Sequence, residues 1–176
     1  RWGIEADDSA GRPLSEQPVG TLMLALAEAA AQDFAPVALL TLLKHPLVRN
    51  EDEAQRLAWL DRVRTLDLLL RGPRSAGGLG GTAERIDRRI ADDEERRLDT
   101  GKWKHLKGWW SELAPQLAPL RQAGRSVNAA LEALRTVGEA LAGDNLWRGR
   151  EGRMLAELWT DLEAGAAFGP DLAEAE

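Results

Sequence analysis

The stretch KWKHLKGWWSELAPQL, residues 102–117, decides the fold predicted for this chain. Its apolar side chains recur at alternating intervals of three and four residues, at Trp103, Leu106, Trp110, Leu113 and Leu117. This spacing is typical of one face of an α-helix that is buried in a core. We therefore expect a helix here, with Pro115 close to its end and with its lysines on the solvent side.

Similar periodicity predicts further helices on both sides of this stretch. They are expected to begin near Pro18, Pro36, Glu51 and Ser126, and the last helix follows DNLWRGREG, residues 144–152. In the charged segment 82–102 only Ile86, Ile90 and Leu98 are candidates for burial, and we interpret its acidic quartet 92–95 as part of a solvated face. Only RWGIEA, residues 1–6, could form a strand. The predicted fold class is all-α, an irregular multi-helix bundle with at most one short N-terminal strand.

A glycine-rich segment separates two parts of the sequence. RSAGGLGG, residues 74–81, contains four glycines and lacks the GxxxxGK[ST] pattern of a phosphate loop. We interpret it as a flexible connector rather than a nucleotide-binding loop. The expected organisation is a helical part at 1–74, a connector at 75–81 and a second helical part at 82–176.

Composition narrows the classes of function. The 176 residues contain no cysteine, which excludes thiolate metal sites and cysteine nucleophiles in this chain, and no apolar run is long enough to span a membrane. The net charge of −6 argues against global electrostatic attraction to nucleic acid, although a local basic face is compatible with it. The start at Arg1 favours a piece of a longer protein, and the first residues contain no apolar leader. The absence of cysteine is compatible with the cytoplasmic location that we expect.

One of the two histidines precedes a proline in LLKHPL, residues 42–47. Proline disfavours the α conformation in the residue before it, so the preceding helix should end near His45. A capping or packing role is the simpler interpretation, and a metal site would need about three protein ligands. His105 has no second histidine at metal-binding spacing. The sequence therefore predicts no metal site, no cofactor site and no catalytic residue.

Two basic sets are the candidates for DNA binding. In GKWKHLKGWW, residues 101–110, lysines alternate with tryptophans, a combination suited to phosphate contacts and base stacking. Trp109 lies off the apolar stripe and is the tryptophan most free for such a role, but the whole segment could also be a core helix with lysines outside. The second set is Arg62, Arg64, Arg71 and Arg74, which could equally be solvated or salt-bridged. The selected candidates are Arg64, Arg71, Arg74, Lys102, Lys104, Lys107 and Trp109.

Four blocks of the sequence resemble, in order, the middle of the bacterial AddB family, the partner subunit of the AddAB helicase-nuclease. They are WGIEADDSAGRPLSEQPVGTLMLALAEAA at 2–30, DFAPVALLTLLKHPLV at 33–48, RVRTLDLLLRGPR at 62–74 and LWRGREG at 146–152. The succession of DDSAGRPL, LLKHPL and LRGPR is the most distinctive part. The first block is also similar, more distantly, to the place where superfamily 1 helicases insert their helical 2B subdomain.

The resemblance implies a non-catalytic helical segment of a subunit that acts in double-strand break repair and recombination. Such a segment would guide DNA and hold the complex together, with an AddA-like helicase-nuclease subunit as its partner. The chain lacks the Walker lysine motif, the nuclease constellation and the iron–sulfur cysteines found elsewhere in such complexes. The alternative is a stand-alone helical interaction module or regulator, which would present an exposed apolar groove between helices. A small hydrolase or metal enzyme is a weaker alternative, because histidines and cysteines are not clustered.

Overall fold

A computed structural model describes residues 12–71, 77–123 and 126–166. These residues form an all-α fold without strands, as predicted, and the expected N-terminal strand lies outside them. The helices are α1 (Pro18–Ala31), α2 (Pro36–Lys44), α3 (Glu53–Leu70), α4 (Gly78–Glu95), α5 (Gly101–Leu117), α6 (Pro119–Gln122), α7 (Val127–Ala142) and α8 (Gly149–Ala166), with short 3-10 helices η1 (Leu14–Glu16) and η2 (Gly143–Leu146).

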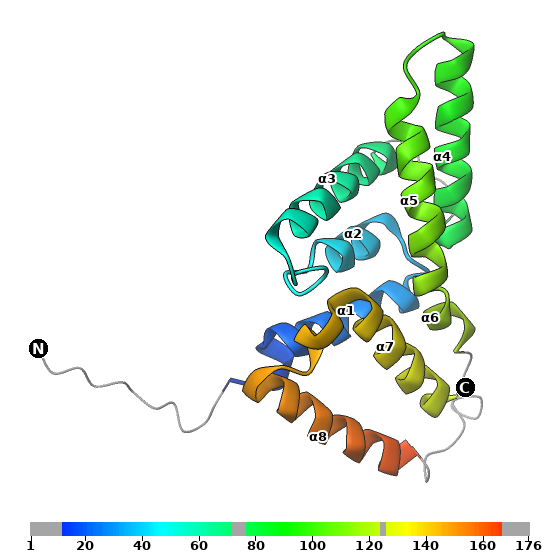
Figure 1. Ribbon diagram of the computed structural model, residues 1–176. Helices are drawn as coiled ribbons and strands as arrows, with labels where there is room; N and C mark the ends of the chain where they lie inside the picture. The colour runs from blue at the N-terminus through cyan, green and yellow to red at the C-terminus, as the bar shows by residue number, and fades with distance from the viewer. Residues whose placement is uncertain (1–11, 72–76, 124–125, 167–176) are drawn as a thin grey trace, which may run out of the picture.

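The helices are arranged as two connected groups (Figure 1). In one group α4 and α5 form an antiparallel hairpin, and α3 packs against both. In the other group α1 packs against α7 and α8. The short helix α2 contacts both α1 and α3, and α6 links α5 to α7, so the two groups meet through neighbouring helices.

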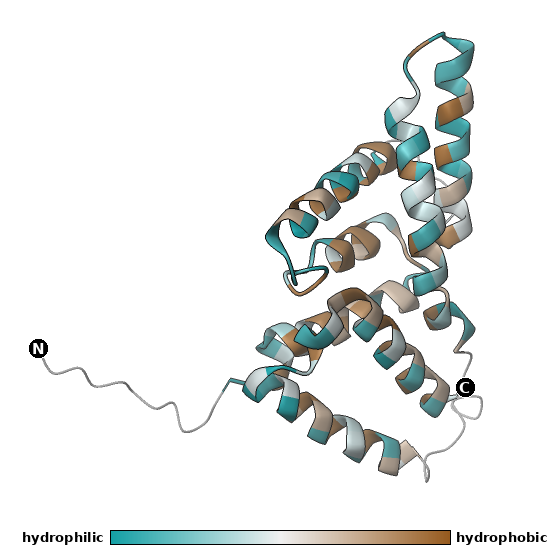
Figure 2. Cartoon of the chain, in the orientation of Figure 1, coloured by the Kyte–Doolittle hydropathy of each residue, from teal (hydrophilic) through white to brown (hydrophobic). Residues whose placement is uncertain are grey.

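The face of α5 predicted from sequence is buried. Trp103, Leu106, Trp110, Leu113 and Leu117 are each at most 4% exposed, and α5 contacts α3, α4, α6 and α7. Pro115 lies within the last turn of α5, near the predicted end of the helix. In Figure 2, by contrast, α4 is a largely hydrophilic helix interrupted by a few apolar residues.

Helix boundaries near prolines follow the predicted positions. Pro18 and Pro36 occupy the first turns of α1 and α2, where a missing N–H costs nothing. Ser126 caps α7, because its hydroxyl oxygen accepts a hydrogen bond from the N–H of Ala129 at 3.4 Å. The expected helix-stop role of the residue before Pro46 is also seen, since α2 ends at Lys44.

One expected core residue is exposed. Leu98, a candidate for burial in the charged segment, is 53% exposed, and Leu57 of α3 is 57% exposed. The buried side chains of α3 are Trp59, Val63, Leu66 and Leu69. The indole Nε1 of Trp59 also donates to the carbonyl of Leu43 on α2 at 2.8 Å, which joins α3 to α2.

The glycine-rich connector is shorter than the sequence suggested. Residues 78–81 form the first turn of α4, and Gly78 and Gly81 are buried, so these residues are not a flexible linker. Helices from both sides of this segment contribute to one hydrophobic core, in which α1 packs against α7 and α3 against α5. At Gly78 the backbone has a positive φ of 84° and a Cβ would lie 2.9 Å from the Asp33 carboxylate, whereas a Cβ at Gly80 would meet nothing within 4 Å.

Gly152 is the position in α8 where a side chain is least tolerable. A Cβ there would overlap the backbone carbonyl of Trp147, whereas a Cβ at Gly108, on the exposed side of α5, would meet nothing within 4 Å. We expect Gly152→Ala to lower the free energy of unfolding by about 1–3 kcal/mol through overpacking. Gly108→Ala should raise it by roughly 0.5–1 kcal/mol, because alanine favours the helix.

Urea denaturation of both variants, followed by circular dichroism, measures these changes. Equal stability of the two variants would show that Gly152 does not lie so close to the backbone of Trp147.

Candidate nucleic-acid interface

A concave surface lined by two of the predicted lysines lies between α3 and α5. One cavity of about 580 Å³ is lined on α3 by Ala58, Asp61, Arg62 and Thr65, and on α5 by Lys102, Lys104, His105, Leu106, Gly108, Trp109 and Glu112. A second cavity of about 260 Å³ shares Ala58, Arg62, Trp109 and Glu112 and extends to Arg49 and Gln116. We call the surface formed by these two cavities the α3/α5 groove. Basic and acidic side chains both line it.

The three predicted lysines of α5 do not form one free basic surface. Lys104 pairs with Glu94 at 2.8 Å and Lys107 pairs with Asp87 at 2.7 Å, both on α4. Lys102 instead lies over the ring of Trp103, with its Nζ 4.5 Å from the ring centroid. Only Lys102 and Lys104 line the α3/α5 groove, whereas Lys107 lines a different cavity.

Arg64, the candidate selected within α3, points away from this groove. Arg62 lines the groove, and a residue two positions further along a helix is rotated by about 200°. Arg64 is therefore exposed on the opposite side of α3. Arg74 lies outside the described residues.

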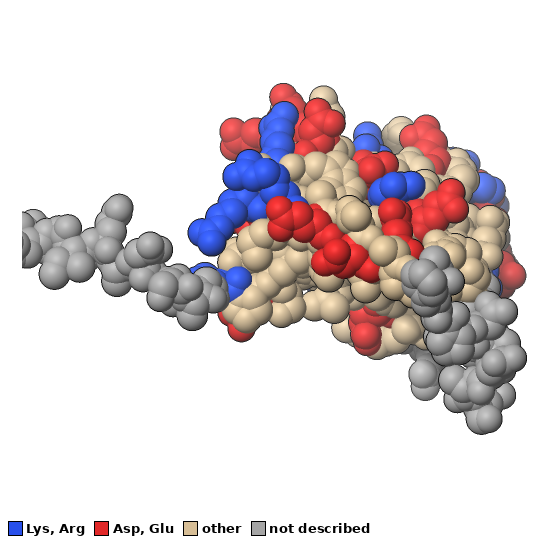
Figure 3. Space-filling view, turned by 90° about the horizontal axis from the view of Figure 1, so that it is seen from below, with Lys and Arg blue, Asp and Glu red and all other residues tan. Residues whose placement is uncertain are grey.

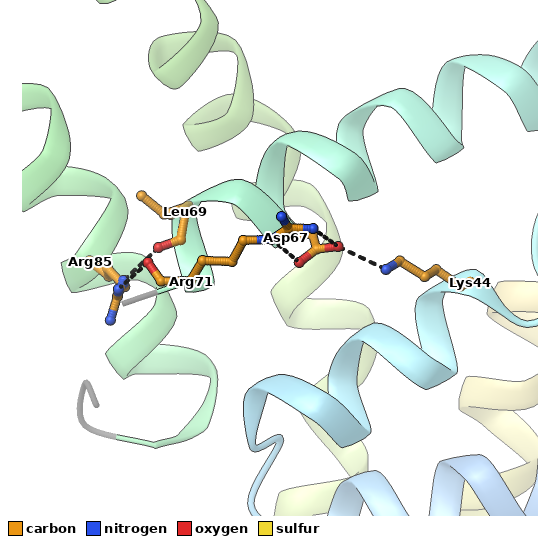
Figure 4. Close-up of polar contacts among 5 residues, drawn as sticks. All are labelled: Lys44, Asp67, Leu69, Arg71 and Arg85. Atoms are coloured by element: carbon orange, nitrogen blue, oxygen red, sulfur yellow. Dashed lines mark hydrogen bonds and ion pairs between the residues drawn. The ribbon is translucent and has the colours of Figure 1, made fainter. Parts of the chain in front are cut away.

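Arg71 is held in a surface ion-pair network. Its Nε is 3.1 Å from Asp67, and the same carboxylate accepts a hydrogen bond from Lys44 at 2.9 Å (Figure 4). Hydrogen bonds from Arg71 and then Lys44 lower the pKa of Asp67. Arg85 of α4 donates to the carbonyl of Leu69 at 2.8 Å and to that of Arg71 at 3.3 Å. The network fixes the end of α3 against α2 and α4.

Trp109 is not free, which corrects the sequence interpretation. It is 7% exposed, and its ring packs edge-on against Trp59 of α3, with centroids 5.1 Å apart. A second contact, to Trp110, has centroids 6.5 Å apart. Both partners cover the indole, so Trp109 offers no open face to a base in this structure.

Two arginines of the groove were not among the selected candidates. Arg62 belonged to the basic set in the sequence, and no ion pair is found for it within the described residues. Arg49 donates to Gln116 at 2.8 Å and lies over the ring of Trp59, at 5.6 Å from the centroid. Helical spacing along α3 could have identified Arg62 from the sequence. Arg49 lies in the turn after α2, and its place at the groove depends on how that turn folds, which spacing does not reveal.

The acidic quartet at 92–95 contains one buried carboxylate, which the expectation of a solvated face missed. Asp93 is 2% exposed and accepts a hydrogen bond from the indole Nε1 of Trp103 at 2.8 Å. Arg89 pairs with the same carboxylate at 3.1 Å and lies 5.3 Å from the Trp103 ring centroid. These contacts join the C-terminal end of α4 to the N-terminal end of α5, so the role of Asp93 is structural.

His45 is part of a hydrogen-bonded junction between α1, α2 and α3. Its Nδ1 accepts a hydrogen bond from the N–H of Leu47 at 3.3 Å, so its Nε2 carries the proton and donates to the hydroxyl of Thr21 on α1 at 3.0 Å. Arg56 of α3 donates to the carbonyls of Lys44 and His45 at 3.0 and 3.1 Å. Both ring nitrogens are used in packing, which supports the structural interpretation of this residue.

Neither a metal-binding cluster nor a membrane-spanning helix is found among the described residues. No group of three or more His, Cys, Asp or Glu residues that could hold a metal ion occurs among them. None of the helices in the part of the chain that the structure describes is long and apolar enough to cross a membrane.

Comparison of the chain with protein-family models, with curated proteins and with solved structures found no match.

The histidine junction predicts a dependence of stability on pH. Burial, and secondly the charge of Arg56, lower the pKa of His45 in the folded state. The unfolded chain therefore binds a proton more readily. This contribution to stability is complete above the ordinary histidine pKa of about 6.5 and is lost as the pH falls below it.

We expect His45→Gln to be less stable than the unmodified chain at pH 7.5 and to lose less stability between pH 7.5 and 5. Urea midpoints at several pH values measure this difference, and His105→Gln, which changes an exposed histidine, is the matched control. An unchanged pH dependence in His45→Gln would contradict the proposed hydrogen bonding.

Proposed function

We propose that the chain is a non-catalytic, 2B-like helical segment of an AddB-like subunit, which guides DNA and scaffolds a helicase-nuclease complex in double-strand break repair. The ordered sequence blocks support this proposal, and the all-α fold agrees with a helical insertion. Motor and nuclease chemistry would belong to other parts of the complex, in the cytoplasm.

The observation that carries the DNA-guiding part is the position of Arg62 and Lys102. They come from different helices, α3 and α5, and line the same groove, with His105 beside them. Neither cation pairs with a carboxylate among the described residues. Phosphate groups would therefore be attracted to these two side chains, while Asp61 and Glu112 at the same groove would limit how far a strand enters.

The buried position of Trp109 changes the expected mode of binding. Base stacking needs an open aromatic face, and Trp109 has none. The proposed contacts are therefore to phosphates, which position DNA without reading its sequence. Lys104, Lys107 and Arg71 are already paired with carboxylates and would contribute less.

We expect the 176-residue chain to bind a fluorescently labelled forked DNA with a steep dependence on salt. The double variant Arg62→Gln/Lys102→Gln should bind more weakly and reduce the slope of log affinity against log salt by roughly 1–2, because each lost phosphate contact contributes about 0.7–0.9. Fluorescence anisotropy at several salt concentrations measures both quantities.

The matched control is Arg71→Gln/Lys107→Gln, which removes the same charge from paired side chains and should have the smaller effect. If the unmodified chain showed no salt-dependent binding, the DNA-guiding part of the proposal would fail.

A second observation favours the scaffolding part, and equally the alternative of a helical interaction module. An open, mainly apolar cavity of about 630 Å³ lies between α4, α5 and α6. Small side chains such as Ala83 and Ala114 leave this space, while Ile86 and Trp110 form part of its wall. The ion pairs Asp87–Lys107 and Arg121–Asp33 involve residues at its edges. An apolar surface with a polar edge is typical of a protein contact.

We expect Ala114→Glu to weaken binding of the chain to an AddA-like subunit about tenfold or more, since it places an unpaired charge in an apolar contact. Surface plasmon resonance with the purified subunit measures the affinity. Gln122→Glu, which adds the same charge at the polar edge of the cavity, is the control. Equal affinities of both variants would exclude this cavity as the contact.

A further inference from the structure

The start of α8 carries a compact basic surface that the sequence analysis did not select. Arg148 directly precedes the helix, and Arg150 and Arg153 lie in its first turns. All three are exposed, and none pairs with a carboxylate within the described parts of the chain. We call these three residues the α8 arginine cluster. Glu151 is the one acidic residue between them.

The charges along α8 are distributed against the helix dipole. The N-terminal end of a helix carries partial positive charge, so acidic side chains are favoured there and basic ones at the other end. In α8 the arginines are at the start, beside the single acidic Glu151, while Glu157 lies at mid-helix and Asp161 and Glu163 lie in the last turns. Helix stability therefore does not explain this arrangement, and it makes the start of α8 a strong local attraction for anions.

The surface view shows the same separation of charge. In Figure 3 basic side chains gather at the left end of the face, where α8 begins in Figure 1, and acidic side chains extend across its middle. A cavity of about 360 Å³ adjoins the cluster; it is lined by Arg148, Gly149 and Glu151, by Asn50 and Asn145, and by the apolar residues Pro18, Val19 and Leu47. Asn145 orients Arg148 by accepting its hydrogen bond at 3.3 Å and itself donates to the carbonyl of Asn50 at 3.3 Å.

We infer that the α8 arginine cluster is an interaction surface for the phosphate groups of a nucleic-acid backbone. Guanidinium groups present paired N–H donors that match phosphate oxygens, and the three side chains can contact successive phosphates. The inference rests on the proposed DNA-guiding function but places the contact on α8, away from the α3/α5 groove. The two surfaces would hold different parts of one forked DNA.

The chemistry of α8 favours a nucleic acid over an anionic membrane. The exposed apolar residues Leu158 and Leu162 lie on the same turns as Glu157, Asp161 and Glu163. An anionic bilayer that contacted both the arginines and the two leucines would also approach these carboxylates and be repelled by them. A single phosphate backbone can contact the start of the helix alone.

The test compares the 176-residue chain with the triple variant Arg148→Gln/Arg150→Gln/Arg153→Gln by anisotropy of labelled forked DNA. We expect the triple variant to bind about tenfold more weakly or worse at low salt, and the salt slope to fall by roughly 2–3, as the loss of three phosphate contacts requires. The control Arg88→Gln/Arg96→Gln/Arg97→Gln removes the same charge from exposed residues of α4 and the turn after it. It should change the affinity less than threefold. Circular dichroism of each variant verifies folding.

The outcomes separate this inference from the proposed function. Equal losses in the triple variant and its control would reduce the effect to net charge and overturn the inference. Binding that is lost in Arg62→Gln/Lys102→Gln but kept in the triple variant would also overturn it, while the DNA-guiding proposal stands. No DNA binding by the unmodified chain would overturn both, and vesicles rich in phosphatidylserine would then show whether the cluster meets a membrane.

Discussion

The burial of the tryptophan-rich face of α5 is the constraint on which the rest of the structure depends. Trp103, Trp109 and Trp110 are each at most 7% exposed, and they contact α3 and α4. Large aromatic side chains give much of the apolar area that a small helical protein can bury. Because these side chains are committed to the core, α5 presents its lysines, His105, Glu112, Pro115 and small residues to solvent.

This separation of a buried tryptophan face from an exposed polar face on α5 determines where binding can occur. The α3/α5 groove exists because two helices are held together at Trp59 and Trp109 while charged residues line its edges. The cavity between α4, α5 and α6 exists because small residues face each other there. Surface ion pairs of this kind add little stability at about 0–1 kcal/mol each, so their main effect is to decide which cations remain free for a ligand.

Sequence periodicity predicted the helices that bury a regular stripe of apolar side chains. It failed where the burial or pairing of a side chain depends on a residue far away in the sequence. The buried stripe of α5 follows from residue spacing alone. The C-terminal end of α2 follows from Pro46. The burial of Trp109, however, requires Trp59, fifty residues earlier, and that of Asp93 requires the indole N–H of Trp103. Likewise the basic residues could be found in the sequence, but their neutralisation by Glu94, Asp87 and Asp67 depends on how α4 and α5 and the end of α3 are packed.

The most direct test of this account is whether Trp109 is closed to solvent and to DNA. ¹⁹F NMR of the chain labelled with 5-fluorotryptophan gives a resonance for each tryptophan, and Trp109→Phe assigns the one that matters. The account predicts a small shift of this resonance between H₂O and D₂O, and at most a small one when forked DNA binds in the groove beside Trp109. A large solvent shift together with a large change on DNA binding would show that Trp109 is exposed and stacks on bases, which would contradict the arrangement of α5.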